Sequence, residues 1–157
     1  TWVPVENASS VIVFCNSLLE HVPDWRGVLR EIALVLKPGG VVIIYTTNRA
    51  CPLQQEVRNF PFYSWLPGPL QTRVLAWIMA NRRDLVGWTE FPAVNWFTFG
   101  GLGRAYRDAG LIPLDRLDLL EQQGRGGALV KLMNRVPLLK LPYQVYAISM
   151  ALYGRKH

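Results

Sequence analysis

Two short apolar runs with an amphipathic stretch between them dominate the first third of the chain. Residues 11–15 (VIVFC) and 41–45 (VVIIY) are mostly β-branched and carry no charge, a pattern typical of strands buried on both faces. Between them, apolar residues recur at helical spacing over residues 28–36, after a capping residue, Asp24, and before a stop at residues 38–40 (PGG). The pattern predicts a strand–helix–strand crossover in a parallel α/β sheet.

The pattern changes after residue 48. Prolines interrupt residues 49–96, and ten of the 18 aromatic residues lie between Phe60 and Phe99. One helix is predicted within this insertion, over residues 70–83. The insertion is either a lid or pocket wall beside the sheet, or a small hydrophobic cluster that only covers it.

Three further elements are predicted towards the carboxyl end. Residues 98–109 predict a helix capped by Thr98. Residues 114–122 and 128–134 are separated by a glycine-rich GRGG stretch, which predicts a β-hairpin.

The last apolar stretch, residues 138–153, predicts a terminal helix with Pro142 in its first turn. This helix is apolar on almost every side. It could pack on the sheet, pair with a second chain to form a homodimer, or make a peripheral contact with a membrane.

Composition narrows the class of protein. The 157 residues are 50% hydrophobic and 18% charged, which is typical of one ordinary folded domain. The net charge of +6 is scattered among leucines rather than clustered, so we predict no nucleic-acid partner. The two cysteines, Cys15 and Cys51, have no metal-binding spacing and predict reduced thiols in a cytoplasmic protein.

The predicted topology also indicates where a ligand would bind. In open parallel sheets, ligands bind beyond the carboxyl ends of the strands. Here these ends are residues 15–17 (CNS) and 46–48 (TTN). The polar stretch NSLLEHVPDW, residues 16–25, therefore lies at the ligand-binding edge of the sheet.

The stretch VIVFCNSLLEHVPDWRGVLREIALVLKPGGVVIIYTTN, residues 11–48, resembles the central part of class I S-adenosylmethionine-dependent methyltransferases that act on small molecules. The similarity rests on the LEHVxD turn after a strand and on the LxEIxxVLKPGG helix end, in that order and spacing. It extends more loosely over residues 96–120. The resemblance implies a partial Rossmann-like sheet, S-adenosylmethionine as cofactor, and methyl transfer to a small, apolar acceptor such as a lipid, quinone or sugar intermediate.

The same resemblance shows what the sequence does not contain. The family binds its cofactor through a glycine-rich turn after the first strand, and no such motif is present. We therefore expect residues 1–157 to be a single, partial methyltransferase domain, the carboxyl-terminal part of such an enzyme. By itself the segment is expected neither to bind the cofactor well nor to turn over.

The resemblance assigns cofactor contacts to five residues. Trp2 and Val3 fall where the family lines the adenine end of the cofactor. Cys15, Asn16 and Ser17 fall where backbone groups approach its methionine end.

His21 is the candidate catalytic residue, because an imidazole titrates near neutrality and could accept a proton from a hydroxyl group. Its alternative role is to hold the turn before Pro23. Some quinone-pathway O-methyltransferases bind a divalent metal through ExxEH, but here Ser17 occupies the first position, so we predict no metal.

Three residues are candidates for binding the acceptor. Asn48 ends the second strand, where it could contact substrate or make a turn. Trp65 and Trp96, in the insertion, could either pack within the protein or bind a flat, apolar acceptor.

One alternative belongs to a different class of function. A non-catalytic remnant of a methyltransferase could bind a partner through the exposed edge of its first strand and through its terminal helix.

Overall fold

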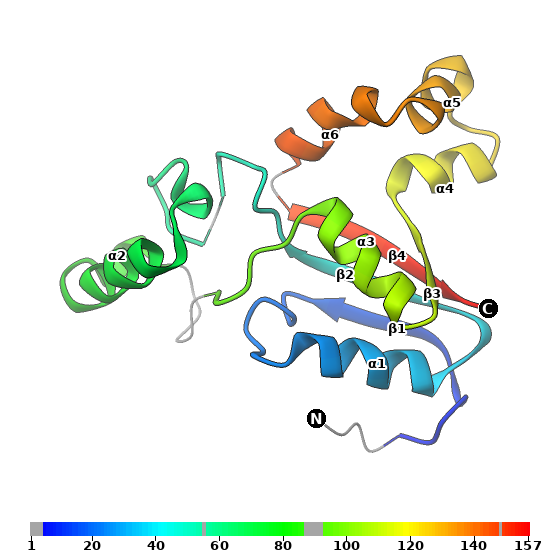
Figure 1. The fold of residues 1–157 in the computed structure, drawn as a ribbon, viewed down its shortest axis with the longest axis horizontal. Coiled ribbons are helices and arrows are strands. Elements are labelled where there is room, and N and C mark those ends of the chain that lie inside the picture. The colour runs from blue at the N-terminus through cyan, green and yellow to red at the C-terminus, as the bar shows by residue number, and fades with distance from the viewer. Residues whose placement is uncertain (1–4, 55, 87–92, 148) are drawn as a thin grey trace.

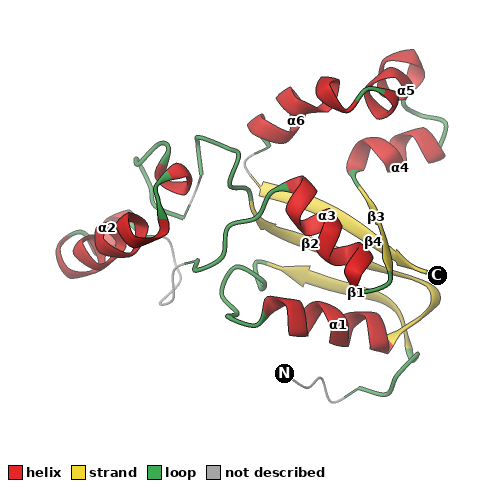
Figure 2. Ribbon diagram, in the orientation of Figure 1, coloured by secondary structure: helices red, strands yellow, loops and turns green. Residues whose placement is uncertain are grey.

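The computed structural model describes residues 5–54, 56–86, 93–147 and 149–157. Four strands form one sheet in the order β1-β2-β4-β3 (Figures 1 and 2). β1 (Ser10–Asn16) and β2 (Leu36–Thr47) are parallel. β4 (Ser149–Lys156) runs antiparallel to both β2 and β3 (Leu111–Leu114). The predicted α/β class and the parallel crossover are confirmed.

The crossover helix is α1 (Trp25–Val35). The Asp24 carboxylate accepts a hydrogen bond from the Gly27 N–H at 2.9 Å, which satisfies one of the free N–H groups of the first turn. The helix ends one residue earlier than predicted, because Leu36 already pairs with Ser10 as the first residue of β2.

Helices α1 and α3 (Phe99–Asp108) pack on one face of the sheet and share its main hydrophobic core (Figure 1). Thr98 caps α3 as predicted, accepting a hydrogen bond from the Gly101 N–H at 3.1 Å. Leu29, Ile44 and Tyr106 are among the fully buried side chains of this core. The core therefore fixes the loop between β1 and α1 relative to the end of β2.

β1 is an edge strand, and the prediction that it is buried on both faces is wrong. Val11, Ile12 and Phe14 are 61%, 65% and 60% exposed. Cys15 is buried in the core. Side chains alternate between the two faces of a strand, so Ile12 and Phe14 lie on the face opposite α1, which no described helix covers.

The insertion holds a 3-10 turn η1 (Tyr63–Trp65), helix α2 (Gly68–Asn81) and a 3-10 turn η2 (Arg83–Leu85). The predicted helix is confirmed, although Ile78 is the only buried residue of α2. Ile78 packs in a second, smaller core with Val57, Tyr63 and Val86. Figure 1 shows this unit at one end of the molecule, beyond the sheet edge where β2 ends.

The predicted hairpin over residues 114–122 and 128–134 is wrong, because the chain forms α4 (Arg116–Gln122) and α5 (Gly127–Arg135). Asp115 and Asp118 form a reciprocal capping box at the start of α4, with N–H to carboxylate distances of 2.8 and 2.9 Å. This local hydrogen bonding favours a helix over a strand.

The predicted terminal helix over residues 138–153 is also wrong. A 3-10 turn η3 (Pro137–Lys140) and the short helix α6 (Leu141–Tyr146) are followed by strand β4. Met150 and Leu152 of β4 are buried, because the strand lies in the sheet between β2 and β3. Pairing with both neighbours thus overrides the helical pattern.

Helix length bears on any membrane contact. In the part of the chain that the structure describes, none of the helices has the length and apolar character required to cross a bilayer.

Candidate functional site

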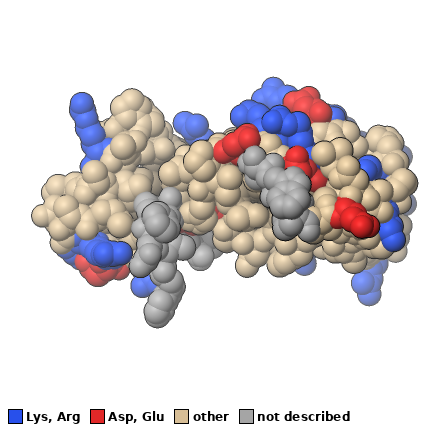
Figure 3. Space-filling view, turned by 90° about the horizontal axis from the view of Figure 1, so that it is seen from below, with Lys and Arg blue, Asp and Glu red and all other residues tan. Residues whose placement is uncertain are grey.

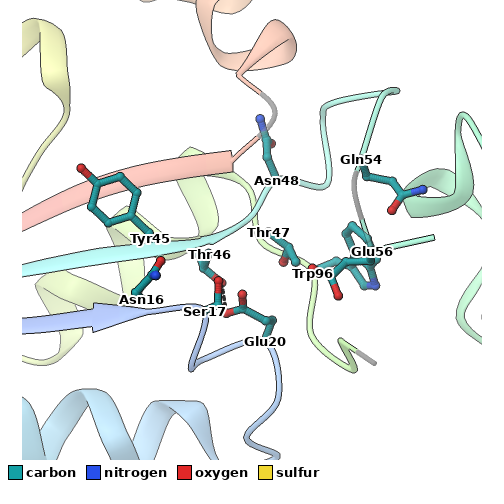
Figure 4. A pocket seen from close by; sticks show the side chains of 10 residues that line it. All are labelled: Asn16, Ser17, Glu20, Tyr45, Thr46, Thr47, Asn48, Gln54, Glu56 and Trp96. Carbon is teal, nitrogen blue, oxygen red and sulfur yellow. Dashed lines mark hydrogen bonds between the residues drawn. The ribbon is translucent and has the colours of Figure 1, made fainter. Parts of the chain in front are cut away.

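A cavity of about 230 Å³ opens beyond the carboxyl ends of β1 and β2, at the predicted edge of the sheet (Figure 4). Asn16, Ser17 and residues 45–48 line it from the strands, and Glu20 lines it from the following loop. Gln54, Glu56 and Trp96 line it from the insertion. Its volume is below the roughly 300–1,000 Å³ typical of sites for drug-sized ligands, so it has room for part of such a ligand.

The carboxyl-terminal end of the insertion is hydrogen-bonded to the loop that follows β1 and to the end of β2. The Asn95 side-chain amide donates to the carbonyls of Leu19 and Val22 at 2.9 and 2.7 Å. The Thr47 hydroxyl donates to the Asn95 carbonyl at 3.0 Å. Because these bonds hold the β1–α1 loop, β2 and the insertion together, Trp96 occupies a fixed place in the cavity wall.

Glu20 is a buried acid at the floor of this cavity. It is 1% exposed, and its Oε2 accepts a hydrogen bond from the Thr46 hydroxyl at 2.7 Å. Its backbone carbonyl accepts from the N–H groups of Val94 and Asn95. A carboxylate removed from water requires such partners, and the position of Glu20 is therefore set by all three segments around the cavity.

Glu56 brings a second carboxyl group to the same cavity. Burial raises the pKa of Glu56, and the charge of nearby Glu20 raises it further. The charge of His21 and a hydrogen bond from the Ala93 backbone partly oppose this rise in the pKa. The two carboxyl groups therefore favour a state in which Glu56 holds its proton more tightly than an exposed glutamate does.

Ser17 has a left-handed backbone with φ of 49°. Such a conformation is uncommon outside glycine and costs on the order of 1–3 kcal/mol where the surrounding structure enforces it. The Ser17 N–H donates to the Tyr45 carbonyl at 3.0 Å, which extends the pairing of β1 with β2 to this residue. Asn16 and Ser17 thus face the cavity at a strained turn.

The predicted cofactor residues fall in three places. Asn16 and Ser17 line the cavity. The Cys15 side chain packs in the hydrophobic core, where burial raises the pKa of its thiol, so only its backbone is available to a ligand. Trp2 and Val3 lie outside the described residues.

His21, the predicted catalytic residue, is half-buried in the turn after Glu20. Its backbone N–H donates to the Leu18 carbonyl at 3.1 Å. Its Nδ1 is buried without a hydrogen-bond partner among the described residues. The imidazole lies near Glu56, whose pKa it lowers, but it does not line the cavity directly.

The three predicted acceptor residues differ in position. Asn48 lines the cavity, but its amide nitrogen donates to the carbonyls of Gln144 and Ala147 at 2.6 Å each, which anchors α6 to β2. Trp96 lines the cavity and packs against the ring of Tyr63. Trp65 is 53% exposed and lies outside the cavity lining.

Six residues of the cavity lining were not predicted as site residues: Glu20, Tyr45, Thr46, Thr47, Gln54 and Glu56. Glu56 is one of few acids in the aromatic insertion, and that contrast was the available signal. Gln54 has no comparable signal in the sequence. In the structure its side chain makes hydrogen bonds to the backbone of Val57 and Phe60, which order its own loop.

Metal binding has no ready donor set in the described ranges. No group of three or more histidine, cysteine, aspartate or glutamate side chains there is arranged to hold a metal ion.

Comparison with known sequences finds a family match in the first part of the chain. Residues 1–44 match the methyltransferase domain family. The ubiquinone biosynthesis O-methyltransferase of Aeromonas salmonicida is 55% identical over 38 residues, which is 24% of this chain and 16% of that protein. The demethylmenaquinone methyltransferase of Lactococcus lactis is 28% identical over 129 residues, 82% of this chain and 46% of that protein. The chain thus spans less than half the length of these curated relatives.

Comparison with solved structures gives the fold of the whole chain. An S-adenosylmethionine-dependent methyltransferase of Mesorhizobium loti matches 98% of this chain and 65% of its own, with a TM-score of 0.52 and 13% identity. A possible histamine N-methyltransferase of Thermotoga maritima, also SAM-dependent, matches 99% of this chain and 59% of its own, with a TM-score of 0.51 and 12% identity. The predicted resemblance is confirmed: the chain carries the methyltransferase-domain sequence pattern in its first 44 residues and has the class I methyltransferase fold.

Proposed function

We propose that this chain forms the acceptor side, and part of the cofactor side, of the active site of an S-adenosylmethionine-dependent methyltransferase. The observation that carries the proposal is the cavity beyond β1 and β2, which joins two carboxyl groups, a strained strand end and an aromatic wall. These features lie at the edge of the sheet where α/β folds bind ligands.

In this proposal Asn16 and Ser17 hold the methionine end of the cofactor, Cys15 contributes backbone, and Trp2 and Val3 contact the adenine end. When bound, S-adenosylmethionine would supply an electrophilic methyl group to a nucleophilic atom of the acceptor. The cavity walls restrict the acceptor to one orientation. In intramolecular reactions, such positioning lowers the barrier by about 7–11 kcal/mol.

The proton of the acceptor hydroxyl needs a receiving group. His21 is the proposed acceptor of this proton, because its imidazole lies near Glu56 at the cavity wall and its Nδ1 has no hydrogen-bond partner among the described residues, although the ring itself is not part of the cavity lining. Glu56 lies at the cavity wall and interacts electrostatically with His21. Its carboxyl group is therefore proposed to orient the acceptor hydroxyl and to tune the imidazole.

The acceptor is proposed to be a small, apolar molecule, and a quinone-type ring is the preferred case. Trp96 offers an aromatic face at the cavity, which suits a flat ring. Relatives named for ubiquinone and menaquinone biosynthesis support the same class of acceptor. Lipid and sugar intermediates remain the other members of the proposed class.

The test is methyl transfer from labelled S-adenosylmethionine to a panel of hydroquinones, catechols and lipid alcohols. It compares the 157-residue chain with the protein as its gene encodes it, because the chain spans under half of the relatives' length. His21→Asn should lower turnover by about 10²–10⁴-fold if it is the proton acceptor. His157→Asn, at an exposed position, is the matched control.

Absence of transfer by the gene-encoded protein to every acceptor would contradict the proposal. That result would favour the second candidate, a non-catalytic module that binds a partner through β1. The observation behind this candidate is the exposed, apolar edge strand, since unpaired strand edges recruit further strands.

A further inference from the structure

Residues 127–146, comprising α5, η3 and α6, form a helical arm that buries none of its own residues. In Figure 1 the arm lies at the top of the molecule, on the other side of the sheet's centre from α1. Large apolar side chains are nevertheless exposed along it: Leu129 68%, Leu132 49%, Val136 38%, Leu138 72%, Leu139 41%, Leu141 48% and Tyr146 74%. Isolated exposed leucines are normal, whereas a continuous set marks an interaction surface.

The inner side of the arm contacts α4 and its capping residue Asp115. The Asn134 side chain donates to the Leu117 carbonyl at 3.3 Å and to the Glu121 carboxylate. Lys140 forms ion pairs with Asp115 and Asp118 at 2.8 and 2.9 Å. These contacts dock the arm on α4 and fix which of its faces points outward.

The outward face of α5 is apolar with a basic flank. Leu129 and Leu132 are three residues apart, so they lie on one side of α5. Val136 follows directly after the helix. Lys131 and Arg135 are four residues apart and exposed. This arrangement is that of a helix that lies in the plane of a membrane interface.

All the charged residues in the last part of the sequence are basic. From Gln122 to His157 the sequence contains six lysines and arginines and not one aspartate or glutamate. Helix α1 carries both signs of charge, as with Arg30 and Glu31. The face of the molecule seen from below shows both acidic and basic side chains (Figure 3). Lys140 is neutralised by its ion pairs with Asp115 and Asp118, whereas Lys131 and Arg135 make no ion pair among the described residues, so these two side chains can complement an anionic partner.

We propose that the outward face of the helical arm binds the surface of an anionic lipid bilayer, with Leu129 and Leu132 in the interface and Lys131 and Arg135 at the headgroups. A second copy of the chain fits this surface less well. Two arms facing each other across a twofold axis would bring the same basic flanks together. The proposal does not depend on the methyltransferase function.

Flotation with phosphatidylcholine vesicles, with and without phosphatidylglycerol, tests the proposal on the whole protein. We expect binding only when phosphatidylglycerol is present, and less binding at high salt. Lys131→Gln/Arg135→Gln should weaken partitioning by roughly 25-fold, at about fivefold for each basic residue near an anionic surface. Leu132→Glu should abolish it.

Matched controls lie on α1. Leu34 is 48% exposed, nearly equal to Leu132 at 49%, and Arg30 is exposed like Arg135. Leu34→Glu and Arg30→Gln should bind as the wild type does, and circular dichroism should show all variants folded. Failure of the wild type to bind anionic vesicles, or equal losses in the α1 controls, would overturn the proposal. So would a dimer that Leu132→Glu dissociates while vesicle binding is unchanged.

Discussion

Glu20 and Glu56 are the residues that give the candidate site its chemical character. Glu20 is held by Thr46 and by the returning backbone of the insertion, whereas Glu56 is placed opposite it by the insertion itself. Burial raises the pKa of Glu56, and the charge of Glu20 raises it further. A site of this kind can orient a hydroxyl group without a metal ion.

The raised pKa of Glu56 predicts a specific pH dependence of stability. Because folding raises this pKa, the fold gains stability below the unfolded-state pKa and loses it as the pH rises through the folded-state pKa. Glu56→Gln removes that loss. Its free energy of unfolding should therefore exceed that of the wild type by more near pH 8 than near pH 4.

Urea unfolding at the two pH values measures this difference. Glu31→Gln, which removes a glutamate on α1 outside the cavity, is the control. The raised pKa of Glu56 would be contradicted if the difference in free energy of unfolding between Glu56→Gln and the wild type were the same at both pH values.

At the scale of elements, local signals were predictable and pairing between distant segments was not. The α1 cap at Asp24 and the α3 cap at Thr98 are readable in the sequence, because each cap bonds residues close by in the chain. The strand β4 was read as a helix, because its burial depends on pairing with β2 and β3. Glu56 was missed for the same reason, since only the fold brings it to Glu20.

Lys140 anchors the helical arm to the start of α4. Its side chain is 12% exposed, and burial alone lowers its pKa, but hydrogen bonds to Asp115 and Asp118 raise it overall. Removing one partner of a buried ion pair leaves an uncompensated charge.

Lys140→Met should therefore lower the free energy of unfolding by about 3 kcal/mol. Thermal or urea denaturation measures this loss. Lys131→Met, at an exposed position on α5, should change stability by less than about 0.5 kcal/mol. A similar loss in both variants would show that the ion pairs do not anchor the arm.

At the scale of the whole molecule, α1 and α3 cover one face of the sheet, and β1 forms one of its two edges. The prediction of a ligand-binding edge followed from topology alone, and the cavity lies there. The exposure of β1 did not follow, because an apolar run does not reveal which neighbours cover it. This edge leaves Ile12 and Phe14 open to a further strand or a second chain.

We therefore expect the chain to self-associate through β1, and Ile12→Lys should reduce this association. A lysine on an edge strand opposes pairing with another strand. Multi-angle light scattering measures the mass, and Leu34→Lys on α1 is the control of similar exposure class. A monodisperse wild-type monomer would contradict this expectation.

The cavity beyond β1 and β2 is proposed to belong to an S-adenosylmethionine site. The most direct measurement is a nitrogen-15 correlation NMR titration of the chain with S-adenosylhomocysteine, because it detects weak binding and locates it. We predict shifts that saturate only in the millimolar range and centre on the amides of Asn16, Ser17 and residues 46–48. Amide shifts confined to other parts of the sheet would contradict this assignment.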